Sequence, residues 1–197
     1  MPWENIKLSD YSVTMWHIDY LDKDLEYQLT TNKIINGSIL DIGCGHGTQS
    51  NLLSNLGFDV TGIDVNEHML NYAKSINPIV KYIHGNFLEY TFDCKFDYTF
   101  DRGCLHLFKN EKKSNFIHKV HSLTNNLFFT KVAQFSQFHN RTPKPISKED
   151  FTKLLSEKFK ILDLIPGKFS EKVTKEQLIF NQKHTPQNSL FAVCEPL

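Results

Sequence analysis

The stretch ILDIGCGHG, residues 39–47, joins a short apolar run to three glycines at alternate positions. The run at 39–42 predicts a buried strand. Glycines at 43, 45 and 47 predict a loop that turns sharply and lets a ligand approach the backbone more closely than a Cβ would allow. Because ligands of open α/β sheets bind at the carboxyl ends of strands, we expect this loop to belong to a binding site.

Strand-like and helix-like segments alternate on both sides of this loop. Apolar spacing predicts helices around 52–57, 69–77, 116–123 and 147–155, with a further one within 12–30. The alternation predicts a doubly wound α/β fold whose seven-stranded sheet is mostly parallel, with an antiparallel last strand. Runs rich in β-branched and aromatic residues predict its strands at 38–42, 59–65, 80–84, 96–100, 127–133, 159–165 and 189–194.

Length and composition narrow the classes of protein that remain. A chain of 197 residues that is 40% hydrophobic predicts one domain over 1–197. The 22 basic side chains balance 22 acidic ones, so a nucleic-acid partner is not expected. No apolar run approaches the roughly 18 residues of a membrane span, and we expect a cytoplasmic protein with no membrane partner, either monomer or homodimer. Four dispersed cysteines without a Cys-x-x-Cys pair predict free thiols and no metal site.

The spacing of the glycines and the next acid indicate the ligand. A dinucleotide-binding loop would have its third glycine at position 48, but that residue is Thr48 and the glycine is Gly47. The second predicted strand ends at Asp64, an acid placed to accept hydrogen bonds from both hydroxyls of an adenosine ribose. A nucleoside-like ligand without a diphosphate is therefore predicted.

The segments ILDIGCGHGTQ, GFDVTGIDVNEHML and FDYTFDRGCLH resemble the class I S-adenosylmethionine-dependent methyltransferases, which have a Rossmann-like fold. The resemblance covers about residues 39–194, and the DRGC-L-H segment is similar to the thiopurine and tellurite-resistance branch. It implies S-adenosyl-L-methionine as cofactor. It also implies a small-molecule methyl acceptor, such as a thiol or other soft nucleophile. A protein or RNA methyltransferase and a non-catalytic cofactor-binding module are the alternatives.

The resemblance assigns roles position by position. Asp41 would orient the ammonium group of the cofactor, and Asp64 would hold its ribose. Asn86 stands where relatives have an acid for the adenine amino group. Asn125 and Asn126 replace a glycine pair and are expected to form a turn before the fifth strand. The full predicted cofactor-binding set is Asp41, Gly43, Cys44, Gly45, Gly47, Asp64, Val65, Asn86, Phe87 and Asp101.

Asp101 and His106 are the candidate catalytic residues, and each has an alternative. Asp101 and its neighbour Arg102 could instead form a structural ion pair or a helix cap. His106 could act as a base or could be a packed helix histidine. Cys44 and Cys104 are expected to be packing residues near the pocket rather than nucleophiles. The acceptor pocket is predicted from an N-terminal helical lid at 1–32, the turn at 102–106 and a substrate loop at 134–146.

Overall fold

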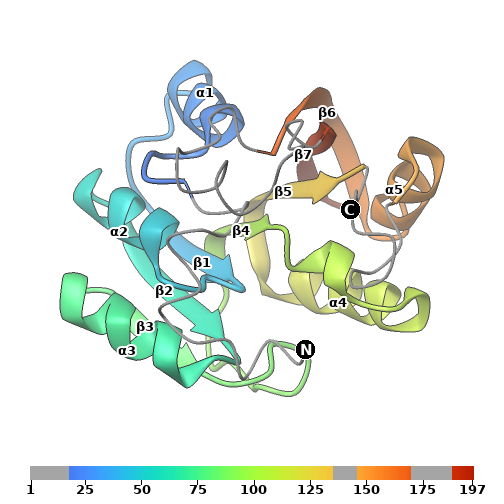
Figure 1. Ribbon diagram of the computed structural model, residues 1–197. Helices are drawn as coiled ribbons and strands as arrows, with labels where there is room; N and C mark the ends of the chain where they lie inside the picture. Colours follow the sequence, from blue (N-terminus) through green and yellow to red (C-terminus); the bar gives the residue numbers. More distant parts are fainter. Residues whose placement is uncertain (1–17, 135–145, 170–187) are drawn as a thin grey trace, which may run out of the picture.

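A computed structural model describes residues 18–134, 146–169 and 188–197. The seven strands form one sheet in the order β3-β2-β1-β4-β5-β7-β6 (Figure 1). This confirms the predicted α/β fold. The strands are β1 (Ser38–Ile42), β2 (Asp59–Asp64), β3 (Lys81–His84), β4 (Phe96–Arg102), β5 (Thr124–Ala133), β6 (Phe159–Lys168) and β7 (Asn188–Pro196).

Strand direction follows the prediction closely. β1 pairs in parallel with β2 and β4, β2 pairs in parallel with β3, and β4 pairs in parallel with β5. β7 lies between β5 and β6 and is antiparallel to both. The predicted turn at Asn125 and Asn126 is wrong, because β5 begins at Thr124 and both residues already lie in the strand.

Helices cover both faces of the sheet (Figure 1). They are α1 (Lys23–Thr31), α2 (Thr48–Asn55), α3 (Glu67–Ile76), α4 (Asn110–Leu123) and α5 (Lys148–Leu155), with a short 3₁₀ helix, η3 (Leu105–Leu107). Ser147 caps α5 by accepting a hydrogen bond from the Asp150 N–H at 3.0 Å. The part of the predicted N-terminal lid before residue 18, and the substrate loop at 135–145, lie outside the described residues.

Alternate side chains of each central strand point to opposite faces of the sheet and belong to two separate hydrophobic clusters. In β1, Ile39 packs with α1, α2 and α3, whereas Leu40 and Ile42 pack on the opposite face with α4 and α5. Phe128 and Phe129 of β5 divide between the clusters in the same way. Burial on both faces explains the near-continuous apolar runs of these strands, and it fixes their carboxyl ends at one edge of the sheet.

The outermost strands are short or irregular. β3 has four residues, and β6 carries a register shift between Ile161 and Asp163 and a proline at Pro166.

No helix within the described ranges is long and apolar enough to cross a membrane.

Candidate cofactor-binding site

The glycine loop leaves the carboxyl end of β1 in the conformation that its sequence predicts. Gly43, Gly45 and Gly47 have φ angles of +70°, +54° and +71°, a region that glycine occupies without strain. The N–H groups of Gly43 and Cys44 both donate to the Ile63 carbonyl, at 2.8 and 3.1 Å. The loop is therefore fastened to β2, and it leads directly into α2.

Packing inside the protein requires two of these glycines. A Cβ at Gly43 would lie 2.7 Å from the Cβ of Cys104, and one at Gly47 would lie 2.8 Å from the Cβ of Ala73 and against the Tyr82 hydroxyl. A Cβ at Gly45 would meet only the Met69 sulfur, at 3.3 Å. The loop thus lies tightly against β3, α3 and the turn after β4, and its middle glycine has the most room.

Asp64 ends β2 with both carboxylate oxygens already engaged. One oxygen accepts from the Gly45 N–H at 2.9 Å and the other from the Asn66 N–H at 2.8 Å. Each oxygen retains a lone pair, and the residue is partly exposed. The arrangement fits an acid that orients the glycine loop and can accept from two further hydroxyl groups.

Three acids meet at the carboxyl edge of neighbouring strands: Asp41 of β1, Asp64 of β2 and Asp101 of β4. Asp41 is buried and accepts from the Ser50 hydroxyl at 2.6 Å. Burial raises the pKa of Asp41 to about 6, and the nearby Asp64 charge adds to the rise. No ion pair involves these acids in the part of the chain that the structure describes. A ligand that carries positive charge would relieve this repulsion.

Asp101 acts as a cap for η3. One oxygen accepts from the N–H groups of Cys104 (2.7 Å) and Leu105 (3.2 Å), and the other accepts from the Thr130 hydroxyl at 2.9 Å. Complete burial raises its pKa to about 7. Asp101 was a candidate for either a helix cap or a catalytic residue. The structure shows the helix cap, and a catalytic or cofactor contact of Asp101 stays a prediction.

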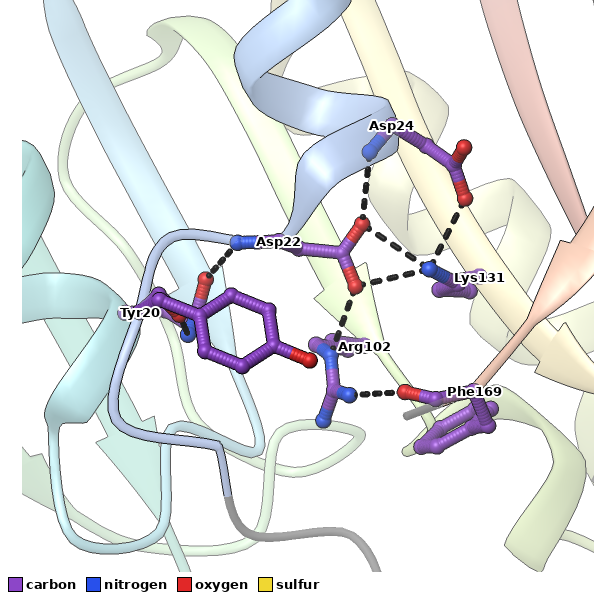
Figure 2. Close-up of polar contacts among 7 residues, drawn as sticks. Tyr20, Asp22, Asp24, Arg102, Lys131 and Phe169 are labelled. Carbon is purple, nitrogen blue, oxygen red and sulfur yellow. Dashed lines mark hydrogen bonds and ion pairs between the residues drawn. The ribbon is translucent and has the colours of Figure 1, made fainter. Parts of the chain in front are cut away.

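Arg102 pairs with Asp22 (Figure 2). No ion pair joins Arg102 to the adjacent Asp101 within the described part of the chain. Its Nε lies 2.8 Å from Asp22, and its guanidinium stacks 4.6 Å from the centre of the Phe169 ring. The Arg102 guanidinium also donates to the Phe169 carbonyl. Of the alternatives for Arg102, the structure shows an ion pair, and its partner lies 80 positions earlier in the chain.

Asp22 lies at the centre of a buried ion cluster, formed with Asp24, Arg102 and Lys131 (Figure 2). Lys131 Nζ is 2.8 Å from both Asp22 and Asp24. Burial by itself would raise the pKa of Asp22, but the charges and hydrogen bonds of Lys131 and Arg102 outweigh it and lower the pKa. The cluster fixes the segment before α1 over the ends of β4 and β5.

The same segment is tied to the cofactor side of the sheet through Gln49 of α2. The Gln49 side chain accepts from the Asp22 N–H at 2.8 Å and donates to the Tyr20 carbonyl at 2.9 Å. Residues 20–22 therefore bridge the helix after the glycine loop and the turn after β4. Sequence reasoning missed both Gln49 and Asp22, because isolated polar residues in a helix and a loop carry no local signal of their partners.

The remaining residues of the predicted cofactor-binding set follow β2 and β3, and Asn86 is the one predicted to contact adenine. The amide oxygen of Asn86 accepts from the Leu88 N–H at 3.1 Å, and its NH₂ group donates to Glu89 at 2.9 Å. The Phe87 ring lies in the core, 4.9 Å from the Phe116 ring. Val65 is partly exposed at the end of β2, with its carbonyl 3.1 Å from His84 Nε2. Contacts of Asn86, Phe87 and Val65 with a cofactor remain predictions.

The two cysteines of the site are packed thiols. A Cβ at Gly62 would lie 2.8 Å from the Cys44 sulfur, and the Cys104 sulfur would lie 3.0 Å from a Cβ at Gly43. Burial raises the pKa of both thiols well above the usual value, and nearby acids add to the rise. Neither environment favours the thiolate that a nucleophilic cysteine needs.

His106 lies in η3 beside the end of β5. Its Nδ1 accepts a hydrogen bond from the Ala133 N–H at 3.2 Å. Burial, with the Lys113 and Arg102 charges nearby, lowers its pKa to about 4. The imidazole is therefore neutral at physiological pH.

A glycine loop after β1, an acid at the end of β2 and an antiparallel β7 define the class I methyltransferase fold, the class that depends on S-adenosylmethionine. Residues 39–126 match the family described as "Methyltransferase domain". The fold is therefore that of the class I methyltransferases, and the family match covers residues 39–126.

Several known proteins are similar to this chain. An uncharacterized methyltransferase of Staphylococcus carnosus is 32% identical over 120 residues, which cover 58% of this chain and 57% of that protein. The matches span about half the length of such curated relatives.

Two solved structures share the fold across 95% of this chain at 16% identity. One is 1,6-didemethyltoxoflavin-N1-methyltransferase of Burkholderia thailandensis with S-adenosylhomocysteine bound (TM-score 0.73, 84% of that chain covered). The other is TehB of Haemophilus influenzae (TM-score 0.71, 65% covered).

Proposed function

We propose that this protein transfers a methyl group from S-adenosylmethionine to a small-molecule acceptor. The observation that carries the proposal is the cluster of Asp41, Asp64 and Asp101 beside the glycine loop, three carboxyl groups that no salt bridge between described residues neutralises. S-adenosylmethionine carries an ammonium and a sulfonium group, so its charge matches what this edge of the sheet needs.

Each part of the chain would contact a different part of the cofactor. Asp41, with its fixed Ser50 contact, would face the ammonium group, and the lone pairs that Asp64 retains would accept from the ribose hydroxyls. The loop of Gly43, Gly45 and Gly47 would lie along the methionine portion. When bound, the cofactor supplies an electrophilic methyl group, and the protein supplies alignment and exclusion of water.

The acceptor class in this proposal is a soft nucleophile, such as a thiol or a related sulfur, selenium or halide species. The two candidate bases are already committed: Asp101 caps η3, and Nδ1 of His106 accepts from the backbone. A soft nucleophile needs little help from a base.

We further infer a cytoplasmic enzyme that acts as a monomer or homodimer, without a nucleic-acid or membrane partner. The balance of 22 basic and 22 acidic residues supports the expected absence of a nucleic-acid partner, since a phosphate backbone attracts clustered positive charge. Sedimentation at several concentrations would measure the oligomeric state.

Titration of the purified chain with S-adenosylmethionine and S-adenosylhomocysteine, followed by turnover assays, tests the proposal. We expect both to bind, and a labelled methyl group to reach members of a panel of small thiols, selenols and halides. Transfer to total RNA or to protein, with none to the small molecules, would favour a macromolecule methyltransferase. Binding without any transfer would favour a non-catalytic cofactor-binding module.

A further inference from the structure

We propose that His106 is a fixed hydrogen-bond donor to the methyl acceptor rather than a general base, so that the site takes acceptors whose nucleophilic atom has no proton to lose. This inference rests on the proposed function and names the acceptor class more narrowly. It depends on the position of His106, on the contact that Nδ1 makes, and on the charges around the ring.

His106 lies within one short turn of the cofactor loop. Cys104, two residues earlier, packs directly against Gly43, where a Cβ would lie 2.7 Å from its own Cβ. Gly103 lies against the His106 ring on the other side: a Cβ there would be 3.2 Å from His106 Cε1 and 2.7 Å from Phe169 Cζ. The turn of residues 103–106 thus connects the loop that would hold the cofactor with the rings of His106 and Phe169.

The backbone selects one tautomer of the His106 ring. A backbone N–H can only donate, so the nitrogen that faces Ala133 at 3.2 Å must be an acceptor and carries no proton. A neutral imidazole has one proton, which therefore lies on Nε2. With Nδ1 occupied and Nε2 protonated, the ring can donate a hydrogen bond but has no free lone pair with which to remove a proton.

The surroundings oppose protonation of the ring as well. Arg102 of β4 and Lys113 of α4 are the charged groups that act on it, and both are cations. Among the described residues, the Phe169 side chain lies 5.7 Å from the ring in an edge-to-face arrangement, and Gly103 and the Ala133 backbone also lie against it. A proton on Nδ1 would also point at the Ala133 N–H. The doubly protonated ring is thus disfavoured by charge, burial and hydrogen bonding together.

The reaction then needs an acceptor that is already deprotonated. A lone pair of the acceptor forms the new bond to the methyl carbon, the carbon–sulfur bond breaks, and its electron pair stays on sulfur. An anionic acceptor becomes neutral, and no proton moves in this step. A thiol would have to release its proton to solvent before transfer, and the Nε2–H of His106 would then donate to the resulting thiolate.

The tautomer can be read without any activity measurement. Long-range ¹H–¹⁵N spectra of the histidine rings, assigned with His106→Gln, should show Nε2–H for His106 and no titration of the ring above about pH 5. His118→Gln, an exposed position on α4, is the matched control. An Nδ1–H tautomer, or a His106 ring that titrates near the usual pKa, would overturn the inference even if methyl transfer is observed.

Kinetics test the acceptor role. Glutamine can accept from Ala133 with its oxygen and donate with its NH₂ group, so His106→Gln should keep kcat/KM for an anionic acceptor within about 3-fold. His106→Ala should lower it by about 10- to 100-fold, the worth of one hydrogen bond to a charged acceptor, with unchanged cofactor affinity. Equal losses of ~10² to 10⁴-fold in both variants would identify a base and overturn the inference. A wild-type protein that methylates nothing would overturn the proposed function, and the spectra would still report the tautomer.

Discussion

Asp22 and Lys131 lie 109 positions apart in the chain, yet their side chains meet at 2.8 Å in a buried ion pair. Both side chains are almost fully shielded from solvent, and Arg102 shares the same carboxylate. Two cations at the ends of β4 and β5 therefore depend on one acid from the segment before α1. This dependence makes Asp22 the residue whose loss should affect the fold most strongly.

We expect Asp22→Asn to lower the free energy of unfolding by about 3–5 kcal/mol, because it leaves two buried cations short of their main partner. Asp24→Asn is the matched control. Asp24 touches the same lysine but is partly exposed, so its loss should lower the free energy of unfolding by less than about 1 kcal/mol. Urea unfolding of the two variants measures the difference, and equal values would show that Asp22 is not the centre of the cluster.

Asp64→Asn should weaken S-adenosylmethionine binding by about 1–3 kcal/mol. Both Asp64 oxygens accept from backbone N–H groups, and an amide would point its NH₂ group at either Gly45 or Asn66. The charge-free variant should therefore perturb the loop as well as the ribose contact. Asp59→Asn, at the exposed opposite end of the same strand, should leave calorimetric affinity unchanged. Full affinity in Asp64→Asn would remove Asp64 from the site.

Asp101→Asn should make the protein more stable than the wild type at pH 8, by about 1–3 kcal/mol, and equally stable near pH 4. The folded protein holds the Asp101 proton more tightly than the unfolded chain, with a pKa raised to about 7. The protonated Asp101 therefore stabilises the folded protein fully at about pH 4 and below. This stabilisation is lost as the pH rises from there through the folded pKa of about 7. Asparagine can keep the bonds to Cys104, Leu105 and Thr130. Unfolding curves between pH 4 and pH 8 should diverge, and parallel curves would contradict the prediction.

Gly103→Ala should destabilise the protein more than Gly57→Ala. Both glycines have positive φ angles, +93° and +99°, so both variants include the same backbone strain. A Cβ at Gly57 meets nothing within 4 Å, whereas one at Gly103 collides with Phe169 and approaches His106. Overpacking should add about 1–3 kcal/mol to the effect of Gly103→Ala. Thermal unfolding compares the two, and equal losses would mean that the Phe169 ring moves aside freely.

Tyr82→Phe should stabilise the protein by about 1 kcal/mol. The Tyr82 hydroxyl is buried against Gly47, with the Ser50 side chain near it but without a well-formed hydrogen bond within the described ranges. Removal of an unsatisfied polar atom should be favourable, and it should also make Gly47→Ala less harmful. A loss of stability in urea unfolding would show that the hydroxyl has a partner after all.

Local sequence patterns were sufficient to predict the sheet and the edge of the sheet that carries the candidate site. The glycines at 43, 45 and 47 require positive φ angles that few other residues tolerate, so their loop could be predicted from residue type alone. Asp64 follows an apolar strand, and strand ends of a parallel sheet converge, so its place beside the loop also follows from order along the chain.

Contacts between distant segments could not be predicted in the same way. Lys131 is a single cation within a strand, and nothing near it in sequence indicates the acids at 22 and 24. The Asn125–Asn126 pair was misjudged because both residues tolerate turns, while the pairing of Thr124 with Phe96 extends β5 through them. Asp101 was placed correctly at the end of β4, but its role as a cap depends on the course of the chain after Gly103.

The irregular outer strands have a consequence for self-association. At one end of the sheet β3 offers only four residues, and at the other the bulge of β6 leaves Leu162 half exposed and Pro166 without an N–H to donate. A further strand would find few evenly spaced partners at either border. Sheets that stop in this way resist growth by addition of strands from other copies, so an assembly of this chain would have to form through helices or loops instead.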